Sequence, residues 1–288
     1  MSYFGSIAHR STSCGRGFFW LGFALILLWP ALAVADGYPV PGQIGFQEPA
    51  TPIAREIFFF HNWILLPIII SICLFVLALL TYVILRFNEK ANPVPTPLTH
   101  HSGLEVAWTV TPVMILVVIA IPSFRLLTHQ LTIPSADITL KATGKQWYWT
   151  YTYPQDQGGG FEFDSEMIQE ADLKPGDIRQ LSVDNEVVVP VGKVIHVQVT
   201  AADVIHSFAV PSFGIRVDAV PGRLNDTWFR AEREGIYYGQ CSKLCGKDHS
   251  DMPIAVRVVN EENYKAWLAE ASKKFASKDE APVHLAAQ

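Results

Sequence analysis

Two cysteines, a histidine and a methionine lie close together near the carboxyl end of the 288-residue chain. They are Cys241, Cys245, His249 and Met252, all within twelve residues. Two neighbouring cysteines in an oxidising compartment form a disulfide by default, and cysteines with a histidine also bind zinc. Neither a disulfide nor a hard-metal site requires a methionine, so the thioether favours a soft metal ion.

An upstream histidine completes a ligand set typical of copper. Together with Cys245, His249 and Met252, His206 gives one thiolate, two imidazoles and an axial thioether, as in a mononuclear blue-copper site. Cys241 is surplus for one copper ion. A second thiolate four residues away lets both sulfurs bridge two copper ions, with a backbone carbonyl completing the coordination. Bridging spreads the unpaired electron over both metals, which indicates electron transfer rather than bond-making.

The residues around this cluster are predicted to form one β-domain. From Leu126 to Gln288 there are 163 residues, which is one domain by length. The stretches 138–142, 197–200 and 254–258 alternate between apolar and polar residues. Turn signals such as Gly158–Gly160 separate them, which favours a β-sandwich or barrel.

Two further features of this domain follow from the same patterns. His196 competes with His206 as a ligand, but it lies inside an alternating strand and is expected to pack or to face solvent. Aromatic residues spaced among Lys and Glu predict an amphipathic helix over Glu261–Lys278, and the tail from Asp279 is predicted to be loose. We assign 126–260 to the β-domain and 261–288 to this helix and tail.

Three apolar blocks precede the domain. The first, 17–29, follows two arginines and leads into the small residues 31–35, which is typical of a signal peptide (1–35) cleaved after Ala35. A retained membrane helix is the alternative, disfavoured by the short run and by Pro30. The runs 57–85 and 106–124 contain no formal charge and are long enough to span a bilayer. They predict a two-helix transmembrane anchor within 36–125.

Composition and topology restrict the class of protein. Half of the residues are hydrophobic and only 17% are charged, and the net charge of -5 gives no support for a nucleic-acid partner. Export of the mature amino terminus, followed by two crossings, places both mature termini and the β-domain outside. We therefore predict a multi-pass protein of a bacterial-type inner (cell) membrane with a periplasmic domain.

Several motifs together resemble subunit II of the cytochrome c oxidases, in the haem-copper oxidase family. They are the two-helix anchor, Gly144–Trp149, Asp203–Phe208, Asp218–Arg223 and the loop Cys241–Met252. The resemblance covers nearly the whole mature chain. It implies an α+β membrane protein, in which a two-helix hairpin precedes an extracytoplasmic, cupredoxin-like β-sandwich or barrel. It also implies a dinuclear copper A centre, with ligands from the side chains of His206, Cys241, Cys245, His249 and Met252 and from the backbone carbonyl of Lys243.

Position 243 departs from the family pattern, which usually has glutamate there. The resemblance gives that glutamate two roles, since its carbonyl binds copper and its carboxylate helps to hold magnesium at the subunit I interface. Lys243 has the carbonyl, but its ammonium has no lone pair for a hard cation. We therefore expect no side-chain ligand to magnesium from this chain.

The resemblance also implies the function. This chain would accept electrons from cytochrome c at copper A and pass them to haem in subunit I of a respiratory terminal oxidase. Subunit I, with haem and copper B, would reduce oxygen to water and pump protons, and subunit III is a further expected partner. No residue of this chain would take part in the oxygen chemistry itself.

Aromatic residues at Trp147, Tyr148 and Trp149, with Tyr151 and Tyr153, have two interpretations. Alternating aromatics are common in strands, where one face packs in the core. The resemblance instead makes Trp147 the surface point at which electrons arrive from cytochrome c, with Tyr148 between it and the copper.

An acidic stretch suggests a docking surface. Nine acids and only two bases lie between Asp156 and Glu186. Such a run is usually a solvated face, but it would also steer a basic cytochrome c. The candidate docking acids are Asp156, Glu162, Asp164, Asp184, Asp203 and Asp218.

Glu105 also has two interpretations. Ser102 and Glu105 form an S-x-x-E capping box at the start of the second membrane helix. The resemblance places a glutamate here at the mouth of a proton channel in subunit I.

Three other classes of protein remain as alternatives. A quinol oxidase subunit without copper is disfavoured by the five intact ligand side chains. Nitrous oxide reductase needs a second catalytic copper domain, for which 288 residues leave no room. A membrane-anchored blue-copper carrier leaves Cys241 unexplained. Because no C-x-x-C-H haem motif occurs, the electron donor is expected to be a separate protein.

Overall fold

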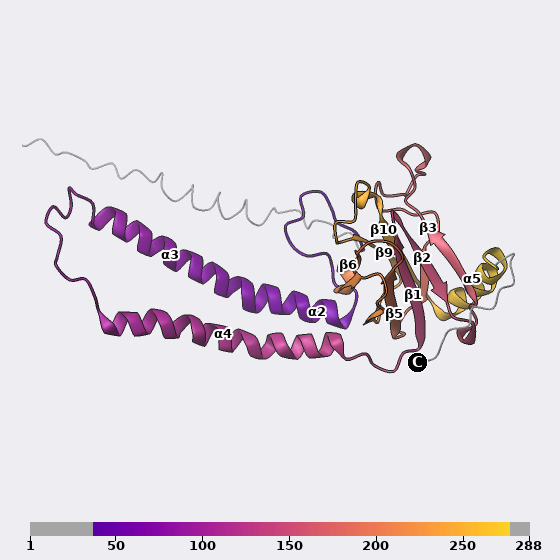
Figure 1. Ribbon diagram of the computed structural model, residues 1–288, viewed down its shortest axis with the longest axis horizontal. Helices are drawn as coiled ribbons and strands as arrows, with labels where there is room; N and C mark the ends of the chain where they lie inside the picture. Colours follow the sequence, from indigo (N-terminus) through magenta and orange to yellow (C-terminus); the bar gives the residue numbers. More distant parts are fainter. Residues whose placement is uncertain (1–36, 277–288) are drawn as a thin grey trace, which may run out of the picture. The chain divides into compact units, whose positions relative to one another are not determined.

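The computed structural model describes residues 37–276, so the predicted signal peptide and the tail from Asp279 lie outside the described residues. Within this part, helical segments precede two β-sheets and a final helix (Figure 1). The helical elements are α2 (Pro52–Phe59), η1 (Phe60–Leu65), α3 (Leu66–Arg86), α4 (Ser102–Leu131), η2 (Gln155–Gln157), η3 (Glu170–Asp172), η4 (Pro211–Phe213), η5 (His249–Asp251) and α5 (Glu261–Lys274). The strands are β1 (Ile138–Lys145), β2 (Tyr148–Tyr153), β3 (Phe161–Ser165), β4 (Val187–Pro190), β5 (Ile195–Ala201), β6 (His206–Val210), β7 (Ile215–Ala219), β8 (Asn225–Phe229), β9 (Gly235–Cys241) and β10 (Pro253–Val259).

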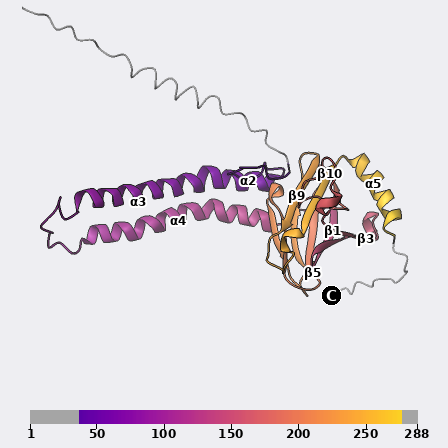
Figure 2. The same cartoon turned by 90° about the horizontal axis from the view of Figure 1, so that it is seen from above.

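Two apolar helical segments are long enough to cross a membrane, and they lie side by side (Figures 1 and 2). The first runs through α2, the π-helical η1 and α3 for 35 residues, and the second is α4 with 30 residues. At 1.5 Å per residue they measure about 52 and 45 Å, more than the ~30 Å apolar thickness of a bilayer. Each helical segment also extends beyond the uncharged run that predicts it, 57–85 for the first and 106–124 for the second.

The start of α4 differs in detail from the predicted capping box. The N-cap is His101 rather than Ser102, because Ser102 is already the first helical residue. Nδ1 of His101 accepts a hydrogen bond from the backbone N–H of Leu104 (3.2 Å), and the Glu105 carboxylate accepts one from the backbone N–H of His101 (3.3 Å). The two reciprocal bonds of a capping box are thus present, shifted by one residue.

The ten strands form a β-sandwich of two five-stranded sheets. One sheet has the order β3-β2-β1-β5-β8 and the other β4-β10-β9-β6-β7. The pairs β1–β5 and β4–β10 are parallel, and the remaining pairs are antiparallel. This confirms the predicted fold class, a two-helix anchor followed by a cupredoxin-like sandwich. Of the metal-binding candidates, His206 begins β6 and Cys241 ends β9 in the second sheet, and the others lie in the connection from β9 to β10.

The core forms between the sheets because alternate residues of each strand face inward. β1 and β5 alternate between buried and partly exposed side chains along their whole length, as the stretches 138–142 and 197–200 predict. Trp149, Tyr151 and Phe208 are among the largest fully buried side chains. The strand interpretation of the aromatic stretch therefore holds from Trp149 onward.

Helix α5 ends earlier than its amphipathic pattern predicts. It begins at Glu261, where the Asn260 side chain accepts a hydrogen bond from a backbone N–H, and it ends at Lys274 rather than Lys278. Phe275 leaves the helical conformation, and its ring stacks on Phe163 with the ring centroids 4.8 Å apart. The helix therefore ends where Phe275 turns into the aromatic cluster beside β3.

Candidate metal centre

The cysteine loop connects β9 to β10 and is tied to β6. Cys241 is the last residue of β9, and its backbone N–H donates to the carbonyl of Met252 (3.0 Å), just before β10. The next N–H in the chain, that of Ser242, donates to the carbonyl of Ser207 (3.0 Å). These bonds bring His206, the first residue of β6, beside the loop.

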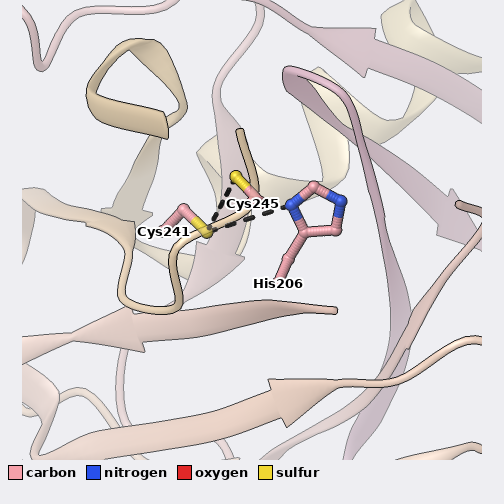
Figure 3. A group of neighbouring side chains, drawn as sticks. All are labelled: His206, Cys241 and Cys245. Carbon is pink, nitrogen blue, oxygen red and sulfur yellow. Dashed lines mark hydrogen bonds between the residues drawn. The ribbon is translucent and has the colours of Figure 1, made fainter. Parts of the chain in front are cut away.

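Three candidate ligand atoms converge in this loop (Figure 3). The donor atoms of His206, Cys241 and Cys245 all lie within 4.8 Å of one another. The two sulfurs are 3.9 Å apart, and Nδ1 of His206 is 3.9 Å from Sγ of Cys241. The cysteines are free, and their spacing is within the ~4.6 Å reached by two sulfurs that each bind one ion at about 2.3 Å.

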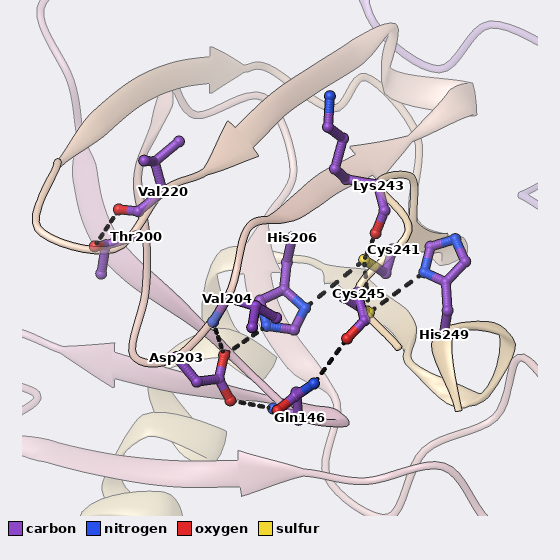
Figure 4. Close-up of polar contacts among 10 residues, drawn as sticks. All are labelled: Gln146, Thr200, Asp203, Val204, His206, Val220, Cys241, Lys243, Cys245 and His249. Atoms are coloured by element: carbon purple, nitrogen blue, oxygen red, sulfur yellow. Dashed lines mark hydrogen bonds and ion pairs between the residues drawn. The ribbon is translucent and has the colours of Figure 1, made fainter. Parts of the chain in front are cut away.

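The other predicted ligands belong to the same loop. Nδ1 of His249 is 3.4 Å from Sγ of Cys245, and the carbonyl oxygen of Lys243 is 3.3 Å from Sγ of Cys241 (Figure 4). Met252 is fully buried at the end of the loop. The structure therefore gathers thiol and imidazole donors at one place and puts Met252 in the same loop, and this soft donor set fits copper. His196 lies elsewhere, on β5, with Nε2 2.7 Å from Asp226.

The two thiols differ in acidity. Burial opposes ionisation of Cys241, but hydrogen bonds from His206 and from backbone groups of Lys243 and Ser207 outweigh it and lower the pKa of Cys241 to about 6. Burial and the negative charge on Cys241 raise the pKa of Cys245 to about 12. The first thiolate therefore forms readily, whereas the second requires a positive charge close to both sulfurs, which a metal ion supplies.

A carboxylate orients the His206 ring. Nε2 of His206 lies 2.8 Å from Oδ1 of Asp203, and this contact turns Nδ1 toward Cys241 (Figure 4). Burial would raise the pKa of Asp203, but hydrogen bonds from His206 and from the backbone N–H groups of Val204 (2.6 Å) and Gln146 (2.7 Å) lower it instead. Asp203 is therefore the partner of a candidate ligand as well as an exposed acid.

Comparison with known proteins decides the family. The family model described as cytochrome c oxidase subunit II, periplasmic domain, matches residues 138–259, and the corresponding transmembrane domain matches residues 39–126. A Rickettsia bellii protein named probable cytochrome c oxidase subunit 2 is 51% identical over 239 residues, which cover 83% of this chain and 88% of the relative. This chain belongs to the cytochrome c oxidase subunit II family.

A second curated relative agrees with this assignment, and a solved structure resembles the β-domain. The cytochrome c oxidase subunit 2 of Cereibacter sphaeroides is 49% identical over 251 residues, covering 82% of each chain. The crystal structure of the periplasmic domain of subunit II from Bradyrhizobium japonicum is 61% identical and covers 50% of this chain and 99% of that one, with a TM-score of 0.47. From the family models and these relatives, this chain is a membrane-anchored subunit of an oxidoreductase complex.

Trp147 packs directly on the candidate metal-binding loop. A Cβ atom added to Gly246 would lie 2.9 Å from Cζ2 of Trp147, so the ring rests on the backbone next to Cys245. Lys247 places its Nζ 5.5 Å from the centroid of the same ring. Tyr148 begins β2, and because successive strand residues point to opposite faces, it faces away from the buried Trp149.

The six candidate docking acids do not form one cluster. Asp156, Glu162 and Asp164 lie in or beside β3, at one edge of the first sheet, whereas Asp218 lies on β7, at an edge of the second sheet. Several have local partners. Asp164 accepts a hydrogen bond from Thr150 (2.5 Å), Asp184 accepts one from the backbone N–H of Glu166 (2.7 Å), and Asp218 lies 3.9 Å from Nζ of Lys243.

Sequence reasoning missed one residue of the site. The amide of Gln146 donates to the carbonyl of Cys245 (2.8 Å), in addition to its backbone bond to Asp203. The only sequence signal is its place in the motif Gly144–Trp149, immediately before Trp147. No spacing rule connects residues 146 and 245.

The affinity of the site for a metal ion is expected to decrease as the pH is lowered. The decrease per pH unit should be steeper below about pH 6 than above it. Metal binding requires deprotonated ligands. Above the pKa of Cys241, the metal mainly has to displace the proton of Cys245. At lower pH it must also displace protons from Cys241 and His206. Burial lowers the pKa of His206, but its contacts with Cys241 and Asp203 outweigh burial and raise it. Zinc competition against a chelator from pH 5 to pH 8 measures this slope, and a constant slope would contradict the expectation.

Proposed function

We propose that this chain is the electron-accepting subunit of a respiratory terminal oxidase and holds a dinuclear copper A centre. The observation that carries the proposal is the pair of free thiols 3.9 Å apart, flanked by the nitrogen atoms of His206 and His249. When bound, the copper pair would supply a one-electron carrier between cytochrome c and the haem of subunit I, where oxygen is reduced to water and protons are pumped at haem and copper B.

The protein contributes a rigid and dry set of donors. His206 and Met252 are fully buried, and Cys241 and Cys245 are each 6% exposed, so water is largely excluded from the sulfurs. The β9–β10 hairpin and β6 hold the donors before any ion binds. A site that changes little in geometry when its charge changes is suited to electron transfer. Cys241 separates this function from that of a single-copper carrier, which needs only one thiolate.

Metal analysis of the purified oxidase complex containing the full chain tests the proposal. We expect two copper ions assigned to this chain, in addition to copper B, and an electron paramagnetic resonance spectrum with hyperfine structure from both nuclei. One copper with a simple blue-copper spectrum would favour the carrier. No copper in this chain, with the thiols kept reduced, would overturn the proposal.

Lys243 gives the site a further property. Its carbonyl faces Cys241, while its ammonium lies 3.9 Å from Asp218. We infer that this chain provides no side-chain ligand to an interfacial magnesium ion, because an ammonium cannot coordinate a cation. A structure of the complex with magnesium or manganese bound to side chains of this subunit would contradict that inference.

The remaining assignments belong to the same proposal. Residues 1–35 form a signal peptide cleaved after Ala35, 36–125 contain the anchor, and the copper domain 126–260 lies on the periplasmic side, followed by 261–288. Subunits I and III are the neighbours in the membrane. Electrons arrive from cytochrome c at Trp147 and Tyr148.

Docking of cytochrome c is expected to weaken with salt. The proposed docking acids lie in separate patches, beside β3 and at Asp184, Asp203 and Asp218, and their summed field steers a basic partner until salt screens it. The second-order rate of cytochrome c oxidation should fall as ionic strength rises from about 10 to 150 mM. Replacing Asp156 and Glu162 by Asn and Gln should flatten this dependence. Kinetics independent of salt would contradict the docking surface.

Glu105→Gln is expected to slow turnover while leaving the complex intact. The carboxamide oxygen of glutamine can still accept the hydrogen bond from the His101 N–H, so the helix cap is retained. A role in proton uptake, in contrast, requires a titratable group. Steady-state oxygen consumption measures the effect, with subunit composition as the control. Unchanged turnover would leave Glu105 with a capping role alone.

A further inference from the structure

A glutamine outside the predicted ligand set connects three parts of the metal centre. Gln146 lies in the turn between β1 and β2, immediately before Trp147. Its backbone N–H donates to Oδ2 of Asp203 (2.7 Å), and its side-chain Nε2 donates to the carbonyl of Cys245 (2.8 Å) (Figure 4). One residue thereby contacts the partner of His206, the backbone of Cys245 and, through its peptide bond, Trp147.

These contacts join the two sheets of the sandwich. β1 and β2 belong to the first sheet, whereas β6 and β9, which carry His206 and Cys241, belong to the second. Oδ1 of Asp203 lies 2.8 Å from Nε2 of His206, so hydrogen bonds run from His206 through Asp203 and Gln146 to Cys245. Two candidate ligands from different parts of the chain are held relative to each other through a residue of the opposite sheet.

The loop segment 244–247 depends on this contact. Within the described residues 37–276, the hydrogen bond from Gln146 links the backbone of this segment to the rest of the domain. The segment also packs on the same turn. A Cβ atom at Gly246 would lie 3.1 Å from Nε2 of Gln146 and 2.9 Å from Trp147, and Gly246 has a positive φ of +135° that favours glycine.

We propose that Gln146 is a positioning residue, which fixes the Cys245 end of the ligand loop relative to His206 and Trp147. The part of this inference that concerns copper rests on the proposed function. Without the Nε2 donor, the carbonyl of Cys245 loses the partner of a partly buried hydrogen bond. The segment 244–247 then opens more often. A displaced Cys245 changes the sharing of the unpaired electron between two bridged metal ions.

Gln146→Met tests the hydrogen bond separately from packing, because methionine has a similar length and no charge but cannot donate. Gln240→Met is the matched control. Gln240 is exposed, adjoins Cys241 and makes only a 3.5 Å contact to the carbonyl of Ser250. Both variants are prepared as the full chain in the assembled oxidase, and Gln146→Ala serves as a second variant.

Two readouts distinguish the possible outcomes. Tryptic cleavage after Lys247, which requires the segment to open, is expected to be about 5- to 30-fold faster in Gln146→Met, the factor for a net loss of about 1–2 kcal/mol, with the amides of β5 still protected from exchange as the sign of an intact fold. The copper hyperfine pattern and reduction potential should also shift, whereas Gln240→Met should change neither these nor the cleavage rate. A cleavage rate, spectrum and potential equal to those of the parent would overturn the inference. Absence of two coppers in the parent would instead overturn the proposed function, while the cleavage measurement would still test the role of Gln146.

Discussion

Replacing Cys241 by serine is expected to reduce the copper bound by this chain from two ions to at most one and to abolish its dinuclear spectrum. Cys241 is the more acidic thiol, and its sulfur lies between the other candidate donors, 3.9 Å from both Sγ of Cys245 and Nδ1 of His206. A serine hydroxyl is neither soft nor ionised at neutral pH, so it cannot bridge two copper ions. The loss of copper affinity should exceed the about 10- to 100-fold that follows removal of a partner of a ligand.

Cys73→Ser is the matched control for this experiment. Cys73 is also a free cysteine, but it is exposed on α3, in the membrane anchor. The same chemical change there should leave copper content, spectrum and oxidation of cytochrome c unaltered. Metal analysis and electron paramagnetic resonance on the purified complex measure both variants. Two coppers retained in Cys241→Ser would show that this sulfur is not a bridging ligand.

The candidate ligands could be predicted from sequence because most of them are neighbours in the chain. A loop of twelve residues contains both sulfur types and one imidazole, and residue chemistry alone indicates a soft metal. Gln146 could not be predicted in this way, because its bond to Cys245 joins residues 99 positions apart on different sheets. Such a contact depends on how the sheets pack, and no local pattern encodes it.

Element ends were harder to predict than element types, for a related reason. Hydropathy detects the part of α4 that lies in the apolar layer, but the helix continues to Leu131 through Arg125 and His129, which water can solvate. α5 ends where Phe275 stacks on Phe163, which is a tertiary contact. Composition likewise groups the acids of 156–186 into one run, whereas the fold distributes the docking candidates over separate edges of the sandwich.

Trp147→Ala is expected to slow electron transfer from cytochrome c by at least about 30-fold, while the copper content and spectrum stay unchanged. The Trp147 ring is only partly buried, and it rests on Gly246, next to Cys245. It therefore connects the surface to the backbone of a candidate ligand. A central tryptophan of a docking site commonly contributes ~2 kcal/mol or more, which corresponds to about 30-fold. Rapid-mixing measurements of copper reduction by reduced cytochrome c determine this rate.

Trp267→Ala separates this role from packing. Trp267 is also partly buried, but it lies on α5, 5.2 Å from the ring of Tyr153 at the far end of β2. At about 3.3 Å per residue, the six residues of β2 place it roughly 20 Å from Trp147. The control should lower stability without slowing electron transfer. Loss of the copper signal in Trp147→Ala would show that the ring mainly supports the loop. Slow electron transfer with an intact copper signal would instead show that the Trp147 ring carries electrons from the docked cytochrome c toward Cys245.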